Sequence, residues 1–138
     1  MHPDAQTLWR GSRWTLTLLI ACLSMLGPFS IDTYLPAFSG IGASIGASPA
    51  EMQQTLSSYL LGFAVMNLFH GALSDSFGRR PVIVAGIGVF VLASVGCALA
   101  GTISLLVAFR ALQGLSAGAG MVVSRAIIRD LFAPADAQ

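Results

Sequence analysis

The 138-residue chain is 55% hydrophobic and only 9% charged, and its formal net charge is +1. A soluble domain has roughly 25% charged residues, so this composition cannot cover a water-exposed surface and suits a lipid bilayer better. The near-neutral net charge also argues against a nucleic-acid partner, which would need a clustered basic face.

Both cysteines, Cys22 and Cys97, fall inside apolar runs and are expected to be small buried residues. No histidine lies near either of them in the sequence. The sequence therefore predicts no metal site and no cofactor. It also shows no catalytic pairing of residues, so we do not expect an enzyme.

Four apolar stretches are long enough to cross a membrane, which predicts an all-α membrane protein with four transmembrane helices. The predicted spans are residues 14–38, 49–73, 81–100 and 103–123, with a tail at residues 1–13 and a polar segment at residues 124–138. The first run is longer than the apolar core of a signal peptide and lacks a cleavage site, so we interpret it as a span.

The arginines predict the orientation of these spans. With the exception of Arg110, all of them fall on one side: Arg10, Arg13, Arg79, Arg80, Arg125 and Arg129. The opposite loops, residues 39–50 and 101–102, contain none. Because arginines near span ends are retained on the cytoplasmic face, both termini and the turn at residues 71–81 are expected in the cytoplasm.

Two short polar stretches mark the ends of the second span. Ser48, Pro49 and Glu51 have the form of a capping box, which predicts that the span begins there. Residues 71–81 are a short polar stretch that contains Gly71 and Gly78, and they are expected to form a hairpin turn to the third span. That third span has no strongly polar residue and is expected to be a structural helix that partly faces lipid.

Asp32 and Arg110 are ionisable residues inside predicted spans, which makes them functional candidates. Asp32 lies between Pro28 and Pro36, which bend a helix. It is either a carboxylate that works within the membrane or the outer end of a shorter helix that faces water. Arg110 either acts within the membrane or extends its side chain to the outer interface.

The second and fourth spans carry further polar or small residues. Asn67 either bonds a neighbouring helix or contacts a ligand, and His70 is either an interfacial residue or a proton relay. Gly114 and Gly118 are four residues apart, a spacing that lets another helix approach closely.

Three motifs resemble signatures of the major facilitator superfamily. Gly71-x-Leu73-x-Asp75-x-x-Gly78-Arg79-Arg80 resembles the loop between its second and third spans. Arg110-x-x-Gln113-Gly114 resembles a span-4 signature of its proton-coupled antiporters, and Asp32-Thr-Tyr34-Leu35-Pro36 resembles one of the twelve-span drug:proton antiporters. The combination is most similar to the Bcr/CflA group of bacterial multidrug efflux transporters, over residues 14–134.

The resemblance implies a fold and a function. The fold would be part of the N-terminal six-helix half, and the chain an N-terminal fragment that needs the missing C-terminal spans. The function would be proton-coupled efflux of drugs or small metabolites across the bacterial inner membrane, with protons and a small molecule as partners. The chain departs from the family pattern in having Ser76 where an arginine is usual, and in its length of four spans.

The resemblance also implies roles for the motif residues. Asp32 would bind the proton, with Arg110 as its partner, and Gln113 and Gly114 would complete the span-4 motif. In the predicted gating loop, Asp75 would dock at a helix end of the other half, and Arg79 would pair with Asp130. Tyr34, Tyr59 and Asn67 are the predicted substrate contacts.

Two alternatives remain open. The loop charges could be ordinary solvated residues that contribute less than about 1 kcal/mol each. The chain could also be a small four-span scaffold or assembly protein with no transport of its own, although such a protein would not need an aspartate and an arginine within its spans.

Overall fold

The computed structural model describes residues 12–131, and this part of the chain is helical apart from short connections. It consists of α2 (Arg13–Ile45), α3 (Pro49–Phe77), α4 (Arg79–Leu99) and α5 (Ile103–Leu131), and it contains no strand. Each helix has a stretch long and apolar enough to cross a membrane. The predicted all-α architecture with four transmembrane helices is confirmed.

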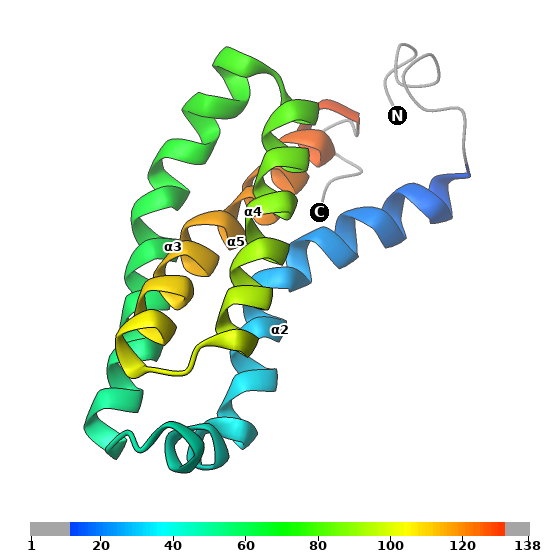
Figure 1. The fold of residues 1–138 in the computed structure, drawn as a ribbon. Helices are drawn as coiled ribbons and strands as arrows, with labels where there is room; N and C mark the ends of the chain where they lie inside the picture. Colours follow the sequence, from blue (N-terminus) through cyan, green and yellow to red (C-terminus); the bar gives the residue numbers. More distant parts are fainter. Residues whose placement is uncertain (1–11, 132–138) are drawn as a thin grey trace.

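The connections alternate between the two ends of the bundle (Figure 1). The α2–α3 and α4–α5 connections lie at one end, and the α3–α4 connection lies at the other. Successive helices therefore run in opposite directions, as four consecutive membrane crossings require.

α5 is the central helix, because it packs against each of the other three and most extensively against α3. Half of its spanning window is buried, compared with 6% for α4. Gly114 lies against the backbone of Tyr59, and Gly118 lies against the side chain of Asn67. A methyl group at either glycine would collide with these neighbours, so the predicted role of both in close helix packing is confirmed.

The first helix is longer than predicted. α2 continues to Ile45 and ends where Gly46 adopts a left-handed conformation, with φ 66°. The expected outer loop at residues 39–50 is therefore wrong over most of its length, because its Gly, Ala, Ser and Ile residues do not stop a helix until that glycine. Pro28 and Pro36 lie inside α2, and the ribbon bends between its blue and cyan parts, as proline predicts (Figure 1).

The start of the second span agrees with the sequence. Ser48 accepts a hydrogen bond from the backbone of Glu51, whose carboxylate accepts one from the backbone of Ser48 at 2.8 Å. Pro49 occupies the first helical position. The predicted capping box is confirmed.

The predicted turn at residues 71–81 is wrong in its extent. α3 continues through Phe77, and Gly78 is the only residue that separates it from α4. Residues 72–77 contain neither glycine nor proline, so nothing in them ends the helix. At 29 residues α3 is roughly 43 Å long, so its last turns can stand beyond a hydrocarbon core of roughly 30 Å.

α5 is also longer than predicted, because the segment from Ser124 continues as helix to Leu131.

The structure does not describe some of the residues that the sequence analysis named. They are residues 1–11 and 132–138, and the side chains of Arg13, Arg79, Arg125, Arg129 and Asp130. The predicted pairing of Arg79 with Asp130 therefore stays a prediction.

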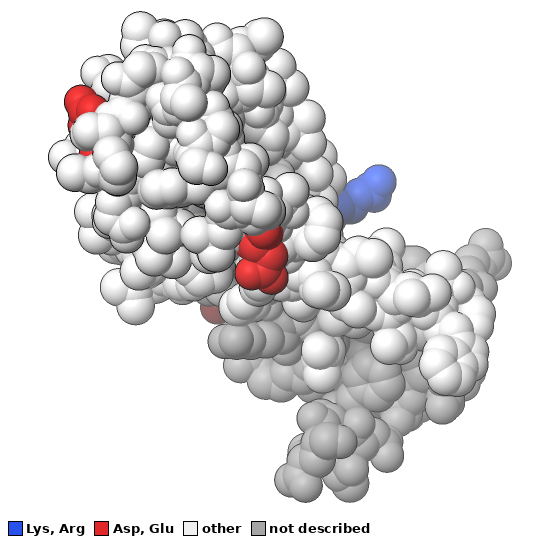
Figure 2. Space-filling view, turned by 90° about the horizontal axis from the view of Figure 1, so that it is seen from below, with Lys and Arg blue, Asp and Glu red and all other residues white. Residues whose placement is uncertain are grey.

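The described surface is mostly uncharged. Figure 2 shows one face, on which isolated acidic and basic groups interrupt a mostly uncharged surface. Large apolar side chains are exposed around the bundle, including Leu68 and Leu99 at about four-fifths exposure. Cys22 is exposed on α2 and Cys97 is half-buried, so the expectation that both are buried is wrong. Such a surface is stable only against lipid or further helices.

Candidate functional site

Arg110 lies at the centre of the bundle and is only 2% exposed. Its guanidinium carbon is 3.8 Å from the ring centre of Tyr34 on α2 and 4.8 Å from that of Tyr59 on α3. Two aromatic faces thus stabilise the cation by cation–π interaction. The side chain is held among the helices.

Hydrogen bonds connect Arg110 directly to α2 and, through Gln113, to α4. Nη1 of Arg110 donates to Oε1 of Gln113 at 2.7 Å and to Oγ of Ser30 on α2 at 3.3 Å. Nε2 of Gln113 then donates to Oγ of Ser94 on α4 at 2.8 Å. Ser94 itself donates to the carbonyl of Phe90 at 2.7 Å. This network fixes both the guanidinium and the amide of the span-4 motif.

The two tyrosine rings are held by their hydroxyl groups. Oη of Tyr59 donates to the carbonyl of Gly27 at 2.9 Å. Oη of Tyr34 lies 2.6 Å from Oγ1 of Thr55, which uses its own hydrogen on the carbonyl of Met52. Tyr34 is therefore the donor in this pair. Both rings are thus held in place beside the arginine.

A cavity of about 370 Å³ between α2, α4 and α5 lies beside this cluster. Polar residues line one part of it: Ser30, Thr33, Tyr34, Ser94, Arg110 and Gln113. Nε and Nη2 of Arg110 are buried without a partner. These two donors share one edge of the guanidinium, an arrangement that fits two acceptor oxygens of a carboxylate or a similar group. No acidic residue of the described chain lines the cavity.

Asp32 lies at a different place from Arg110. Its side chain is exposed and lines a smaller cavity of about 260 Å³, together with Pro28, Tyr59 and Phe63. Nη1 is the only guanidinium nitrogen of Arg110 with a hydrogen-bond partner, and its partners are Ser30 and Gln113. The guanidinium therefore forms no ion pair with Asp32. Tyr59 contacts the guanidinium of Arg110 and also lines the smaller cavity beside Asp32.

The other predicted residues do not join the cluster. Asn67 is placed against Gly118, and its Oδ1 is buried without a partner. Asp75 and Arg80 are exposed at the α3–α4 end, on either side of Gly78. Gly71 lies within α3, and nothing packs where its side chain would be.

Sequence reasoning missed Ser30, Ser94 and Thr55, which complete the cluster. A serine or threonine in an apolar helix often bonds only a carbonyl of its own helix, so its presence alone does not indicate a site. Ser94 makes such a bond and also accepts from Gln113. Through this contact the third span holds Gln113 in place.

Comparison with known proteins finds a matching family model and similar transporters. The family model described as Major Facilitator Superfamily matches residues 17–138. An uncharacterized MFS-type transporter, YdgK, of Bacillus subtilis is 44% identical over 120 residues, which are 87% of this chain and 30% of that protein.

Two further relatives have names that refer to resistance. A bicyclomycin resistance protein homolog of Haemophilus influenzae is 39% identical over 121 residues, 88% of this chain and 30% of the relative. The multidrug resistance protein MdtL of Escherichia coli is 45% identical over 108 residues, 78% of this chain and 28% of the relative. The chain thus spans about 30% of the length of the relatives it matches.

Proposed function

The chain belongs to the Major Facilitator Superfamily, and from this premise we propose that it forms the first four helices of a proton-coupled exporter of drugs or small metabolites. The names of two relatives refer to bicyclomycin and multidrug resistance, which supports this substrate class. In this proposal the chain acts with further helices of the same transporter, and transport proceeds by alternating access in the bacterial inner membrane. Both ends of the chain lie in the cytoplasm, as the arginines suggest.

The observation that carries the proposal is the buried charge of Arg110. A cation inside the membrane costs several kcal/mol unless it meets a partner or water. Two tyrosine rings and two neutral acceptors compensate part of that cost, and two donors stay unused. The site is therefore ready to receive an acceptor group, either from the substrate or from Asp32.

In this proposal Asp32 takes up and releases the coupling proton. A carboxylate next to a guanidinium prefers the ionised form, and a carboxylate moved away into an apolar environment prefers the protonated form. Asp32 lies on α2 between Pro28 and Pro36, where the helix lacks hydrogen bonds and can bend. Ser30 and Tyr34 face Arg110, and Asp32 lies two residues from each, on another face of α2. Rotation of this segment about its axis, past Tyr59, would bring Asp32 to Arg110 and take it away again.

The α3–α4 connection would act as the gate of the same cycle. Asp75 is exposed on the last turn of α3, where it is accessible to the positive end of a helix from the other half. Docking there would hold the cytoplasmic side closed, with Gly78, Arg79 and Arg80 shaping the connection and Asp130 as the predicted partner of Arg79.

The test is drug export by cells that express the complete transporter. Asp32→Asn keeps the size of the side chain but cannot exchange a proton, so we expect export driven by the pH gradient to be lost. Glu51→Gln is the matched control, because Glu51 is the carboxylate of the capping box and glutamine also fits that position. Unchanged export in Asp32→Asn, at equal expression, would exclude Asp32 as the coupling residue.

A further inference from the structure

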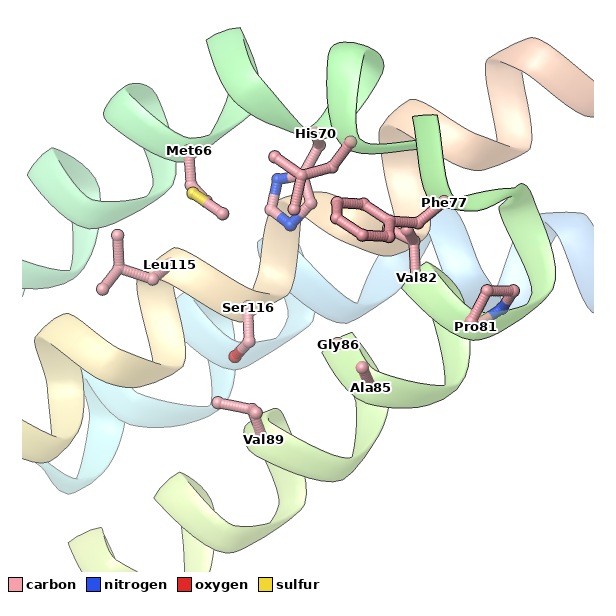
Figure 3. Close-up of a pocket in the computed structure, with 11 residues that line it drawn as sticks. Met66, His70, Phe77, Pro81, Val82, Ala85, Gly86, Val89, Leu115 and Ser116 are labelled. Carbon is pink, nitrogen blue, oxygen red and sulfur yellow. The ribbon is translucent and has the colours of Figure 1, made fainter. Parts of the chain in front are cut away.

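A second cavity, of about 380 Å³, lies between α3, α4 and α5 (Figure 3). It shares no lining residue with the cavity beside Arg110. Its position near the α3–α4 connection is shown by Phe77 and Pro81, which both line it. The mechanism proposed above does not use this space.

The lining of this cavity is almost entirely apolar. Met66, Phe77, Val82, Val89 and Leu115 are among its side chains, and none of its lining residues carries a formal charge at neutral pH. A charged molecule would lose its hydration here without compensation. The cavity therefore suits an uncharged, mostly apolar molecule.

Two buried polar side chains face this apolar space. Ser116 is 7% exposed, and its hydroxyl is within bonding distance of the carbonyls of Leu112, at 3.1 Å, and Gln113, at 3.0 Å. Because the single hydroxyl hydrogen is used within α5, Ser116 can only accept a hydrogen bond from a molecule in the cavity.

His70 is the second polar side chain, and it is 4% exposed with no partner for Nδ1. Figure 3 shows its imidazole projecting from α3 into the space between Ser116 and Phe77. His70 is thus enclosed by helices. Its Nδ1 lies against Gly118 of α5, which does not line the cavity. The hydrogen-bonding group of the cavity is therefore Ser116, and His70 lies beside it.

We propose that this cavity binds a small uncharged molecule that has an apolar body and one hydroxyl or N–H group. The apolar body fills the space between Met66, Val89 and Leu115, and the polar group donates to Ser116 beside His70. This makes the cavity a second ligand site, distinct from the transport site at Arg110. A lipid acyl chain, which has no hydrogen to donate, is the competing occupant.

The test compares 2-naphthol with naphthalene, which has the same rings without the hydroxyl group. Each compound is equilibrated with the complete protein in lipid nanodiscs, and binding to empty nanodiscs of the same composition is subtracted. We expect saturable binding of 2-naphthol at one site, about tenfold tighter than that of naphthalene, as one hydrogen bond to a buried group predicts.

Variants assign this binding to the cavity. Val89→Trp fills it and should weaken 2-naphthol binding at least about tenfold, whereas Val91→Trp, on the exposed side of the same helix, should leave it unchanged. Ser116→Ala should reduce the preference for 2-naphthol over naphthalene. Ser57→Ala, which removes an exposed serine hydroxyl bonded within α3, should not.

Three results would overturn the proposal. The first is equal binding of 2-naphthol and naphthalene, which a site for acyl chains would give. The second is unchanged 2-naphthol binding in Val89→Trp. The third is a preference for 2-naphthol that persists in Ser116→Ala. None of these results depends on whether Asp32 and Arg110 couple transport to protons.

Discussion

Arg110 lies on α5 and contacts α2 and α3 directly and α4 through Gln113. The planar shape of its guanidinium group therefore matters as much as its charge. Its two rings and two hydrogen-bond acceptors surround a planar group. A lysine keeps the charge but has no planar guanidinium group to stack on the rings of Tyr34 and Tyr59.

We therefore expect Arg110→Lys to lower the free energy of unfolding by about 2 kcal/mol, because cation–π contacts and charged hydrogen bonds are lost. Thermal unfolding of the purified complete protein is the measurement. Arg80→Lys is the control, since Arg80 is exposed, and it should change the melting temperature little. Equal effects of the two substitutions would show that the cluster does not depend on the guanidinium.

At the scale of single residues, the sequence indicated Arg110 as the centre of the site but did not indicate all of its neighbours. An arginine within an apolar span is rare enough to be noticed, and its motif partner Gln113 follows on the next turn. Ser30 and Ser94 come from other helices, and which face of each helix meets Arg110 depends on packing that one sequence does not specify.

At the scale of the helices, glycines decide how closely α5 approaches its neighbours. Gly114 lies so close to the backbone of Tyr59 that a methyl group there would overlap with the carbonyl. The backbone of α3 cannot move aside as a flexible side chain could.

Gly114→Ala should therefore destabilise the protein by about 2 kcal/mol or more, since the two helices must separate. Gly88→Ala is a matched control within α4, because nothing lies within 4 Å of the added methyl group. That control should be neutral or slightly stabilising, because alanine favours a helix more than glycine does. If both variants unfold at the same temperature, close packing at Gly114 contributes nothing.

Gly78 determines the α3–α4 connection through its backbone conformation, φ 87° and ψ 155°, which is almost restricted to glycine. Gly78→Ala should cost about 1 to 3 kcal/mol of folding free energy. Gly71→Ala, in open space within α3, should not be destabilising. Thermal unfolding distinguishes these outcomes, and a neutral Gly78→Ala would contradict the strained connection.

The helices themselves were predictable, but several of their ends were not. Apolar length and the capping box at Ser48 located the spans. Gly71 and Asp75 suggested a turn, yet without a true breaker before Gly78 the helix continues through them. The same reason extends α2 to Ile45, because small residues favour a turn only weakly when no proline or left-handed glycine enforces it.

At the scale of the whole molecule, the two ends of the bundle should face opposite sides of the membrane. Ala50 lies just after the α2–α3 connection and Ser76 just before the α3–α4 connection, and both are exposed. In a background without Cys22 and Cys97, a cysteine at Ala50 should react with a membrane-impermeant maleimide added to intact cells. A cysteine at Ser76 should react only after permeabilisation, and the reverse pattern would invert the proposed orientation.

The most direct test of the account separates coupling from transport in proteoliposomes of the complete protein. Exchange of labelled for unlabelled substrate needs no net proton movement, whereas accumulation against a gradient needs coupling to the pH difference. We predict that Asp32→Asn retains exchange and loses pH-driven accumulation, while Glu51→Gln retains both. Accumulation by Asp32→Asn at the wild-type level would contradict the assignment of the coupling proton to Asp32 and of Arg110 as its partner.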